Sequence, residues 1–175
     1  MNSQTEIRLS GSGGQGLILA GIILAEGALN DGKNAIQSQS YGPEARGGAS
    51  KAEVIISNTD INYPKVSKCD ILLSLTQKSC DKYLDSLKKD GILIIDSGVE
   101  RPNRSDVKIY QVPILDKAKK DVGTSLVSNI VALGAINGIT KLVDKEILKQ
   151  AILNRVPPGT EEKNEKAYEY GLNIF

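Results

Sequence analysis

Histidine and tryptophan are absent from this 175-residue sequence, and phenylalanine occurs once. Without histidine, the chain cannot build a Ser-His-Asp or Cys-His catalytic site, a histidine-ligated zinc site or imidazole acid–base chemistry. The two cysteines, Cys69 and Cys80, form no CxxC motif and are too few for a four-thiolate iron–sulfur cluster. We therefore expect no catalytic residue and no metal site in this chain, and no nucleophile–base pair can be assembled from it.

Charge and aromatic content argue against a nucleic-acid partner. Lys and Arg number 22, Asp and Glu number 21, and the net charge is +1, so the chain lacks the basic excess of a nucleic-acid-binding protein. Six tyrosines and one phenylalanine also offer few platforms for base stacking. We expect no binding of nucleic acid.

No segment of the sequence has the character of a membrane span or a signal peptide. The longest apolar stretch, residues 126–143, contains Ser128, Asn129 and Lys141, which favour a buried helix of a globular protein. Residues 1–6 are polar and lack the basic and apolar regions of a secretory signal. We therefore expect a cytoplasmic protein without a membrane partner, with both thiols reduced.

The chain length and the alternation of strand and helix patterns predict one α/β domain over residues 1–175, with a mostly parallel sheet flanked by helices. Apolar runs predict strands at residues 7–9, 34–37, 52–57, 61–63, 71–75, 92–96 and 109–112. Helices are expected at residues 17–29 and 77–89, and from residue 116 until Pro157-Pro158-Gly159 stops the pattern. A polar tail is expected after that stop.

A glycine-rich loop follows the first predicted strand. Its GxGxxG pattern predicts a Rossmann-like glycine turn at the start of a helix, where backbone N–H groups can contact an anion. The candidate residues are Gly11, Ser12, Gly13, Gly14, Gln15 and Gly16. Residues 36–39 supply no carboxylate for a ribose, and no Lys-Ser/Thr pair follows the loop, so a nicotinamide site and a Walker A cradle are disfavoured. The alternative is a turn that only permits tight helix–sheet packing.

A second loop has almost no aliphatic side chains. Its candidate contact residues are Tyr41, Gly42, Pro43, Glu44, Arg46, Gly47 and Gly48. Proline stiffens such a loop and glycine lets its backbone approach another surface closely. Arg46, its one cation, offers a planar fork to a carboxylate or phosphate. The alternative is an exposed loop whose charged side chains are solvated.

Several further residues have structural interpretations. Asp96 and Ser97 end a predicted strand at the edge where ligands bind in open α/β sheets, but a turn or helix cap is favoured for them. Cys80 lies on the apolar face of its helix and is expected in the core. Gly21, inside the first helix, indicates close approach of a neighbouring element. The 126–143 helix, which includes Gly134, is expected in the core or at a subunit interface.

Taken in order, these motifs resemble the gamma subunit, or gamma domain, of the 2-oxoacid:ferredoxin oxidoreductases. The segments that carry the resemblance are residues 11–16, 40–48, 63–64, 70–75, 129–135 and 164–171. They span nearly the whole chain, and the first two motifs in tandem are more specific than either alone. The Tyr-Gly-Pro-Glu-x-Arg-Gly-Gly segment is more similar to the 2-oxoglutarate branch than to the pyruvate branch.

The resemblance implies a multisubunit enzyme that decarboxylates a 2-oxoacid, forms an acyl-coenzyme A and reduces ferredoxin. It places thiamine diphosphate, magnesium and the iron–sulfur clusters in other subunits, and it implies alpha, beta and ferredoxin-like delta-type subunits as partners. Coenzyme A would be placed with help from this chain. The isolated chain is expected to be inactive.

The resemblance also suggests roles for the two loops. Residues 11–16 would offer N–H groups to a phosphate or a partner carbonyl, and residues 41–48 would reach a neighbouring subunit near the cofactor pocket. Arg46 would pair a carboxylate or phosphate there. Alternatives remain open: a subunit acting on 2-oxoisovalerate, pyruvate or indolepyruvate, a stand-alone nucleotide-binding enzyme, or an assembly module without a ligand.

Overall fold

The computed structural model describes residues 4–39 and 48–175, and its centre is a six-stranded sheet with the order β2-β3-β1-β4-β5-β6. The strands are β1 (Gln4–Ser12), β2 (Asn34–Gln39), β3 (Ala49–Ser57), β4 (Cys69–Ser74), β5 (Leu87–Asp96) and β6 (Lys108–Val112). β3 runs antiparallel to its neighbours β1 and β2, whereas β1, β4, β5 and β6 pair in parallel. The predicted mostly parallel sheet is confirmed.

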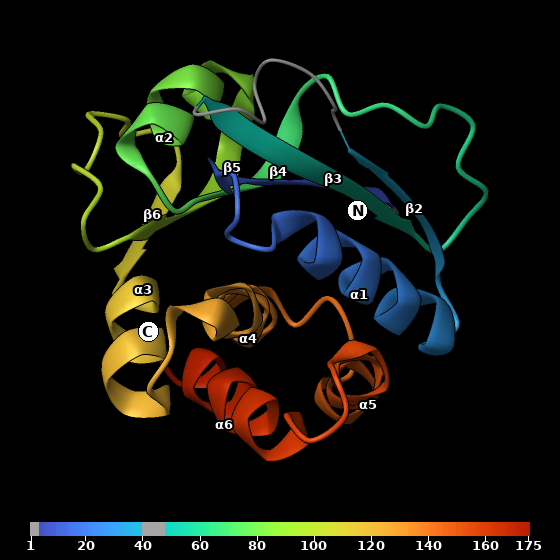
Figure 1. Cartoon of the computed structure of the whole chain (residues 1–175). Helices are drawn as coiled ribbons and strands as arrows, with labels where there is room; N and C mark the ends of the chain where they lie inside the picture. The colour runs from blue at the N-terminus through green and yellow to red at the C-terminus, as the bar shows by residue number, and fades with distance from the viewer. Residues whose placement is uncertain (1–3, 40–47) are drawn as a thin grey trace.

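The helices cover the two faces of the sheet unequally. They are α1 (Leu17–Asn30), α2 (Gln77–Tyr83), α3 (Ile114–Asp116), α4 (Ser128–Thr140), α5 (Lys145–Arg155) and α6 (Glu161–Leu172), with a π-helix, η3 (Lys117–Val122), and 3-10 turns η2 (Leu84–Ser86) and η4 (Ser125–Val127). Figure 1 shows α2 on one side of the sheet and α1, α4, α5 and α6 on the other. α5 packs on α1, and α6 packs on α4. The second face therefore carries two helical layers.

Alternating side chains of the central strands supply two cores. Ile7 and Leu9 of β1 are fully buried on the face covered by α1 and α4. Leu72 of β4 points to the opposite face and joins the smaller cluster beneath α2. Because successive strand side chains point to opposite faces, runs that are apolar at every position identify strands buried on both sides.

Helices α4 and α6 approach each other at backbone distance through glycine. A Cβ at Gly134 would collide with the carbonyl oxygen of Tyr168 and would lie 2.8 Å from the Cα of Gly171. Gly21 in α1 lies similarly against β3, where its Cβ would be 3.2 Å from the Cβ of Ala52. The expected close approach at Gly21 is confirmed, and the small residues of α4 belong to the core.

The predicted strand at residues 61–63 is wrong. This segment has no strand conformation, and Tyr63 is exposed. A hairpin return from β3 would need a free edge of that strand, but β1 and β2 already pair with both of its edges. Pro64 also removes a donor at this point.

The predicted helix over residues 77–89 is too long, because α2 ends at Tyr83 and β5 begins at Leu87. Leu87 is buried and pairs with Cys69 of β4, and the register then shifts before Ile71. Asp90 takes a positive φ of 66° at this irregularity. Residues 87–89, which the helical pattern assigned to the helix, therefore belong to strand β5.

The expected polar tail is also wrong, because residues 161–172 form α6. Its buried side is a narrow stripe at helical spacing: Asn164, Ala167, Tyr168 and Gly171. The rest of the segment is mostly charged, so the sequence shows only a weak helical pattern there. None of the helices within the described residues is long and apolar enough to cross a membrane.

Candidate functional site

The glycine motif connects the end of β1 to α1. Gly11 and Ser12 still belong to the strand, and the turn itself comprises Gly13 to Gly16. Gly14 and Gly16 have φ values of +85° and +74°, which non-glycine residues rarely adopt. Gly16 is the N-cap of α1 and supplies no side-chain hydrogen bond. The first N–H groups of α1 are therefore left for another partner.

Gln15 and Asn129 hold this turn in shape. Oε1 of Gln15 accepts a hydrogen bond at 2.8 Å from the backbone N–H of Ser12, and it lies where a side chain at Gly11 would be. Nδ2 of Asn129, in the first turn of α4, donates at 3.1 Å to the carbonyl oxygen of Gly16. A Cβ at Gly16 would lie 2.6 Å from that nitrogen. Glycine at positions 11 and 16 thus makes room for the amides that fix the turn.

A cavity of about 390 Å³ opens beside the turn. Its lining includes Gly14, Gly16, Leu126, Asn129, Thr160 and Lys163. These residues come from the starts of α1 and α6 and from the η4–α4 junction, and Val156 and Pro157 at the end of α5 complete the lining. Leu126 stands 82% exposed at its rim.

The electrostatics of this cavity favour an anion. The starts of α1 and α6 each carry a partial positive charge of about half an elementary charge. The start of α4 continues from η4, whose Thr124 cap and Ser125 carbonyl already bind N–H groups there, and the end of α5 adds a partial negative charge. Lys163 is the one charged side chain among the described residues that line the cavity. The arrangement can therefore bind a phosphate or carboxylate without a metal ion.

Most of the second candidate loop lies outside the described residues, including Tyr41, Gly42, Pro43, Glu44, Arg46 and Gly47. Gly48 is described and is half-buried immediately before β3. The first residue of β3, Ala49, pairs with Ser12 at the end of β1. The structure thus brings the end of the second motif next to the glycine turn, although they are far apart in sequence.

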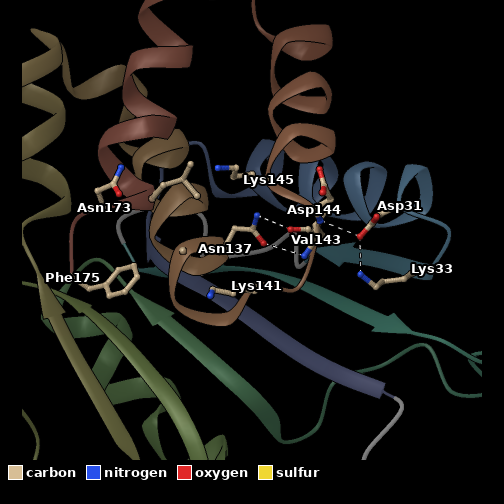
Figure 2. Close-up of a pocket in the computed structure, with 11 residues that line it drawn as sticks. Asp31, Lys33, Asn137, Lys141, Val143, Asp144, Lys145, Asn173 and Phe175 are labelled. Atoms are coloured by element: carbon tan, nitrogen blue, oxygen red, sulfur yellow. Dashed lines mark hydrogen bonds and ion pairs between the residues drawn. The ribbon is translucent and has the colours of Figure 1, made fainter.

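A larger cavity, of about 700 Å³, lies at the opposite ends of α1, α4 and α6 (Figure 2). Its lining includes three lysines and two aspartates: Lys33 contacts Asp31 at 2.8 Å, and Asp144 caps α5. Helix C-termini carry partial negative charge, which Lys141 at the end of α4 helps to neutralise. The two cavities therefore differ mainly in their helix ends, because this one lies at the C-terminal ends of α1, α4 and α6 and the other at the starts of α1 and α6.

The remaining candidates have structural roles, as expected. The two carboxylate oxygens of Asp96 accept hydrogen bonds from the backbone of Gly98 and Leu115, each at 2.9 Å, so Asp96 caps a turn and a helix start. Cys69 and Cys80 are free and buried. Burial raises the pKa of the Cys69 thiol to about 11 and also raises that of Cys80, so neither is an activated nucleophile.

Sequence reasoning did not identify Asn129 or Lys163 as site residues. In the sequence, Asn129 is a polar residue within the apolar 126–143 stretch and the first residue of the 129–135 segment that carries the family resemblance. Lys163 lies in the segment interpreted as a tail. Asn129 bonds to the glycine turn and Lys163 lines the cavity beside it, and both positions depend on the packing of α4 against α6. Among the described residues there is no group of three His, Cys, Asp or Glu side chains placed to hold a metal ion.

Comparison with known proteins gives consistent matches over the whole chain. The family model for pyruvate ferredoxin/flavodoxin oxidoreductase matches residues 6–174. The 2-oxoglutarate synthase subunit KorC of Methanocaldococcus jannaschii is 49% identical over 173 residues, which cover 97% of this chain and 92% of that subunit.

Solved structures agree. The keto/oxoacid ferredoxin oxidoreductase gamma subunit from Geobacter sulfurreducens PCA superposes with a TM-score of 0.90 and 49% identity, over 98% of this chain and 95% of that one. The 2-oxoglutarate:ferredoxin oxidoreductase from Magnetococcus marinus, solved with 2-oxoglutarate, coenzyme A and succinyl-CoA bound, gives a TM-score of 0.87. The identity there is 20%, over 98% of this chain and 31% of that chain, so this match shows the fold alone.

Proposed function

This chain belongs to the pyruvate ferredoxin/flavodoxin oxidoreductase family, and from that membership we propose that it is the gamma subunit of a 2-oxoglutarate:ferredoxin oxidoreductase. The family resemblance predicted from the sequence is thereby confirmed. The choice of 2-oxoglutarate rests on the 49% identity with a 2-oxoglutarate synthase subunit over nearly the full length of both chains.

In the proposed reaction, 2-oxoglutarate loses the carboxyl group next to its keto carbon as CO2, and the remaining acyl group, which keeps the second carboxylate, forms a thioester with coenzyme A. The two electrons released by this oxidation pass to ferredoxin. Thiamine diphosphate supplies the carbanion chemistry of decarboxylation, and iron–sulfur clusters carry the electrons. This chain offers two buried cysteines and no described cluster of metal ligands, so we assign thiamine diphosphate, magnesium and the clusters to partner subunits.

The observation that supports a coenzyme A-binding role for this chain is the cavity at the glycine turn, which is lined by Lys163. Coenzyme A has several phosphate groups, and the cavity combines the start of α1 with Lys163. We assign one phosphate-bearing part of coenzyme A to this cavity, with residues 11–16 supplying the turn. A cavity of about 390 Å³ takes only part of so large a molecule. The rest would extend toward partner subunits.

The second loop is assigned to subunit contact. The support for this assignment is that Gly48, the last residue of the motif, directly precedes Ala49, which pairs with Ser12 beside the glycine turn. Arg46 would pair a carboxylate or phosphate at that contact. The alpha, beta and ferredoxin-like delta-type subunits are the proposed neighbours, and the chain by itself would be inactive.

The assembled complex, purified anaerobically, tests this proposal through its substrate profile. We expect ferredoxin reduction that requires coenzyme A and is fastest with 2-oxoglutarate, compared with pyruvate, 2-oxoisovalerate and indolepyruvate at equal concentration. A higher kcat/KM for another of these acids would contradict the substrate assignment. In the same complex, Arg46→Ala should weaken assembly or raise the KM for coenzyme A, and no change in either would contradict the role of the loop.

A further inference from the structure

Leu126 is the most exposed large apolar side chain among the described residues. It is 82% exposed, whereas the next in order, Tyr63, is 65% exposed. Single apolar side chains are common on protein surfaces, so exposure alone assigns no role to Leu126. Its place in the fold is the informative observation, because Leu126 lines the cavity at the glycine turn and is open to a ligand there.

The backbone of η4 fixes the position of Leu126. The N–H of Leu126 donates to Oγ1 of Thr124 at 3.2 Å, and Oγ of Ser128 donates to the carbonyl oxygen of Ser125 at 2.7 Å. The next residue, Val127, is buried in the main core. The turn is thus held on both sides of Leu126, and it places this side chain at the rim of the cavity.

The cavity lining combines apolar side chains with one cation. Leu126 shares the lining with Leu19 of α1 and with Val156 and Pro157 at the end of α5. Lys163 of α6 is exposed and supplies the positive charge. Ligand sites are commonly lined by apolar side chains with a few polar groups that fix the orientation of the ligand. A ligand that matches this lining within about 390 Å³ carries an anionic group and an apolar group only a few bonds apart.

We propose that Leu126 binds the methyl-bearing part of the pantothenate arm of coenzyme A, with the adjoining diphosphate toward Lys163, which makes Leu126 a specificity-determining residue. This inference rests on the proposed coenzyme A site and adds the orientation of the ligand. In coenzyme A, a single O–CH2 link joins the diphosphate to the carbon that carries two methyl groups. The adenine ring is separated from the diphosphate by a whole ribose, so the pantothenate side is the better match to so small a cavity.

The test uses the assembled complex carrying Leu126→Ala, with Leu29→Ala as the matched control. Leu29 is an exposed leucine at the other end of α1 and does not line this cavity. Leu126→Ala should raise the KM for coenzyme A about tenfold, which corresponds to about 1.4 kcal/mol and fits the covering of part of one leucine side chain. The kcat at saturating coenzyme A and the KM for the 2-oxoacid should not change. Leu29→Ala should leave all three constants unchanged, and Leu126→Met should restore the KM for coenzyme A.

Two fragments of coenzyme A identify the part that Leu126 contacts. 4′-Phosphopantothenate carries a phosphate and the two methyl groups, whereas adenosine 3′,5′-bisphosphate carries phosphates and adenine without the arm. Each is measured as a competitive inhibitor against coenzyme A. Leu126→Ala should raise the Ki of the first about tenfold and leave the Ki of the second unchanged. The reverse pattern would overturn the inference, and so would an unchanged KM for coenzyme A.

Folding and assembly separate the remaining outcomes. Because the Leu126 side chain is largely exposed in the folded chain, Leu126→Ala should keep the urea unfolding midpoint and the subunit ratio of the complex. Loss of a partner subunit from the variant complex would show that Leu126 is a subunit contact and would overturn the inference. Lys163→Gln tests the proposed site itself, because it should raise the KM for coenzyme A while Leu126 is intact. If only Leu126→Ala leaves that KM unchanged, the inference fails alone; if both variants do, the proposed site fails with it.

Discussion

Replacing Gly16 by alanine tests the geometry of the glycine turn directly. Gly16 has a φ of +74°, and its Cβ would lie 2.6 Å from Nδ2 and 3.0 Å from Cγ of Asn129. Gly14 has a similar φ of +85°, but a Cβ there would meet nothing within 4 Å. The two substitutions therefore share a backbone penalty, and Gly16→Ala carries an additional steric one.

The magnitudes follow from these contacts. Holding an alanine in the left-handed region costs about 1–2 kcal/mol, and this should be the whole effect of Gly14→Ala. Gly16→Ala also displaces the buried Asn129 side chain, which loses its bond to the Gly16 carbonyl and is pushed off its rotamer, for about 2 kcal/mol more. We expect a loss of about 3–4 kcal/mol in the free energy of unfolding.

Urea denaturation of the full chain, followed by circular dichroism, measures both variants. A double-mutant cycle with Asn129→Ala isolates the steric part: in the Gly16→Ala background, removing the Asn129 amide should recover about 1–2 kcal/mol. Equal losses for Gly14→Ala and Gly16→Ala, or no coupling in the cycle, would refute the reasoning that Asn129 and Gly16 are fitted to each other.

Three further predictions concern stability. Gly134→Ala should lower the free energy of unfolding by about 2–4 kcal/mol, because its Cβ would force α4 away from α6; an unchanged urea midpoint would contradict the packing described. Glu53→Gln should cost about 3 kcal/mol, because the Arg8 guanidinium, 2.8 Å away and 4% exposed, would keep its charge without a counterion, and a loss under 1 kcal/mol would argue against that burial. Burial raises the pKa of Cys69 from 9.0 to about 11, so the unfolded chain loses this thiol proton first as the pH rises. Stability should therefore be unaffected by Cys69 below pH 9 and fall by about 2–3 kcal/mol between pH 9 and 11, a decline that Cys69→Ala should reduce in denaturation curves at each pH.

Sequence reasoning succeeded where local pattern and tertiary environment agree. The runs at residues 71–73 and 92–95 are apolar at every position and lie in the parallel strands β4 and β5, which are buried on both faces of the sheet. It failed where neighbours decide the structure. Residues 87–91 are part of a strand because they lie along the edge of β4, with which β5 pairs. Residues 161–172 form a helix because a stripe of four buried residues packs against α4.

The candidate site also has one part that was predictable from local sequence and another that depends on long-range packing. The glycine turn was predictable because its φ values and the helix start after it are local properties of residues 11–16. The place of β3 between β1 and β2, which brings Gly48 to that turn, depends on long-range pairing that no local pattern encodes. Asn129 and Lys163 depend on the packing of α4 and α6 around α1, more than a hundred residues away from the turn in the sequence.

The central claim, that this chain works as a subunit of a larger oxidoreductase, is tested most directly by its partners. The tagged chain would be purified anaerobically from its source cells, and the co-purifying proteins identified by mass spectrometry. We predict recovery, in fixed ratio, of thiamine diphosphate-binding subunits and a ferredoxin-like subunit, together with coenzyme A-dependent oxidation of 2-oxoglutarate. Recovery of the chain alone, without that activity, would contradict the account and favour an independent nucleotide-binding protein.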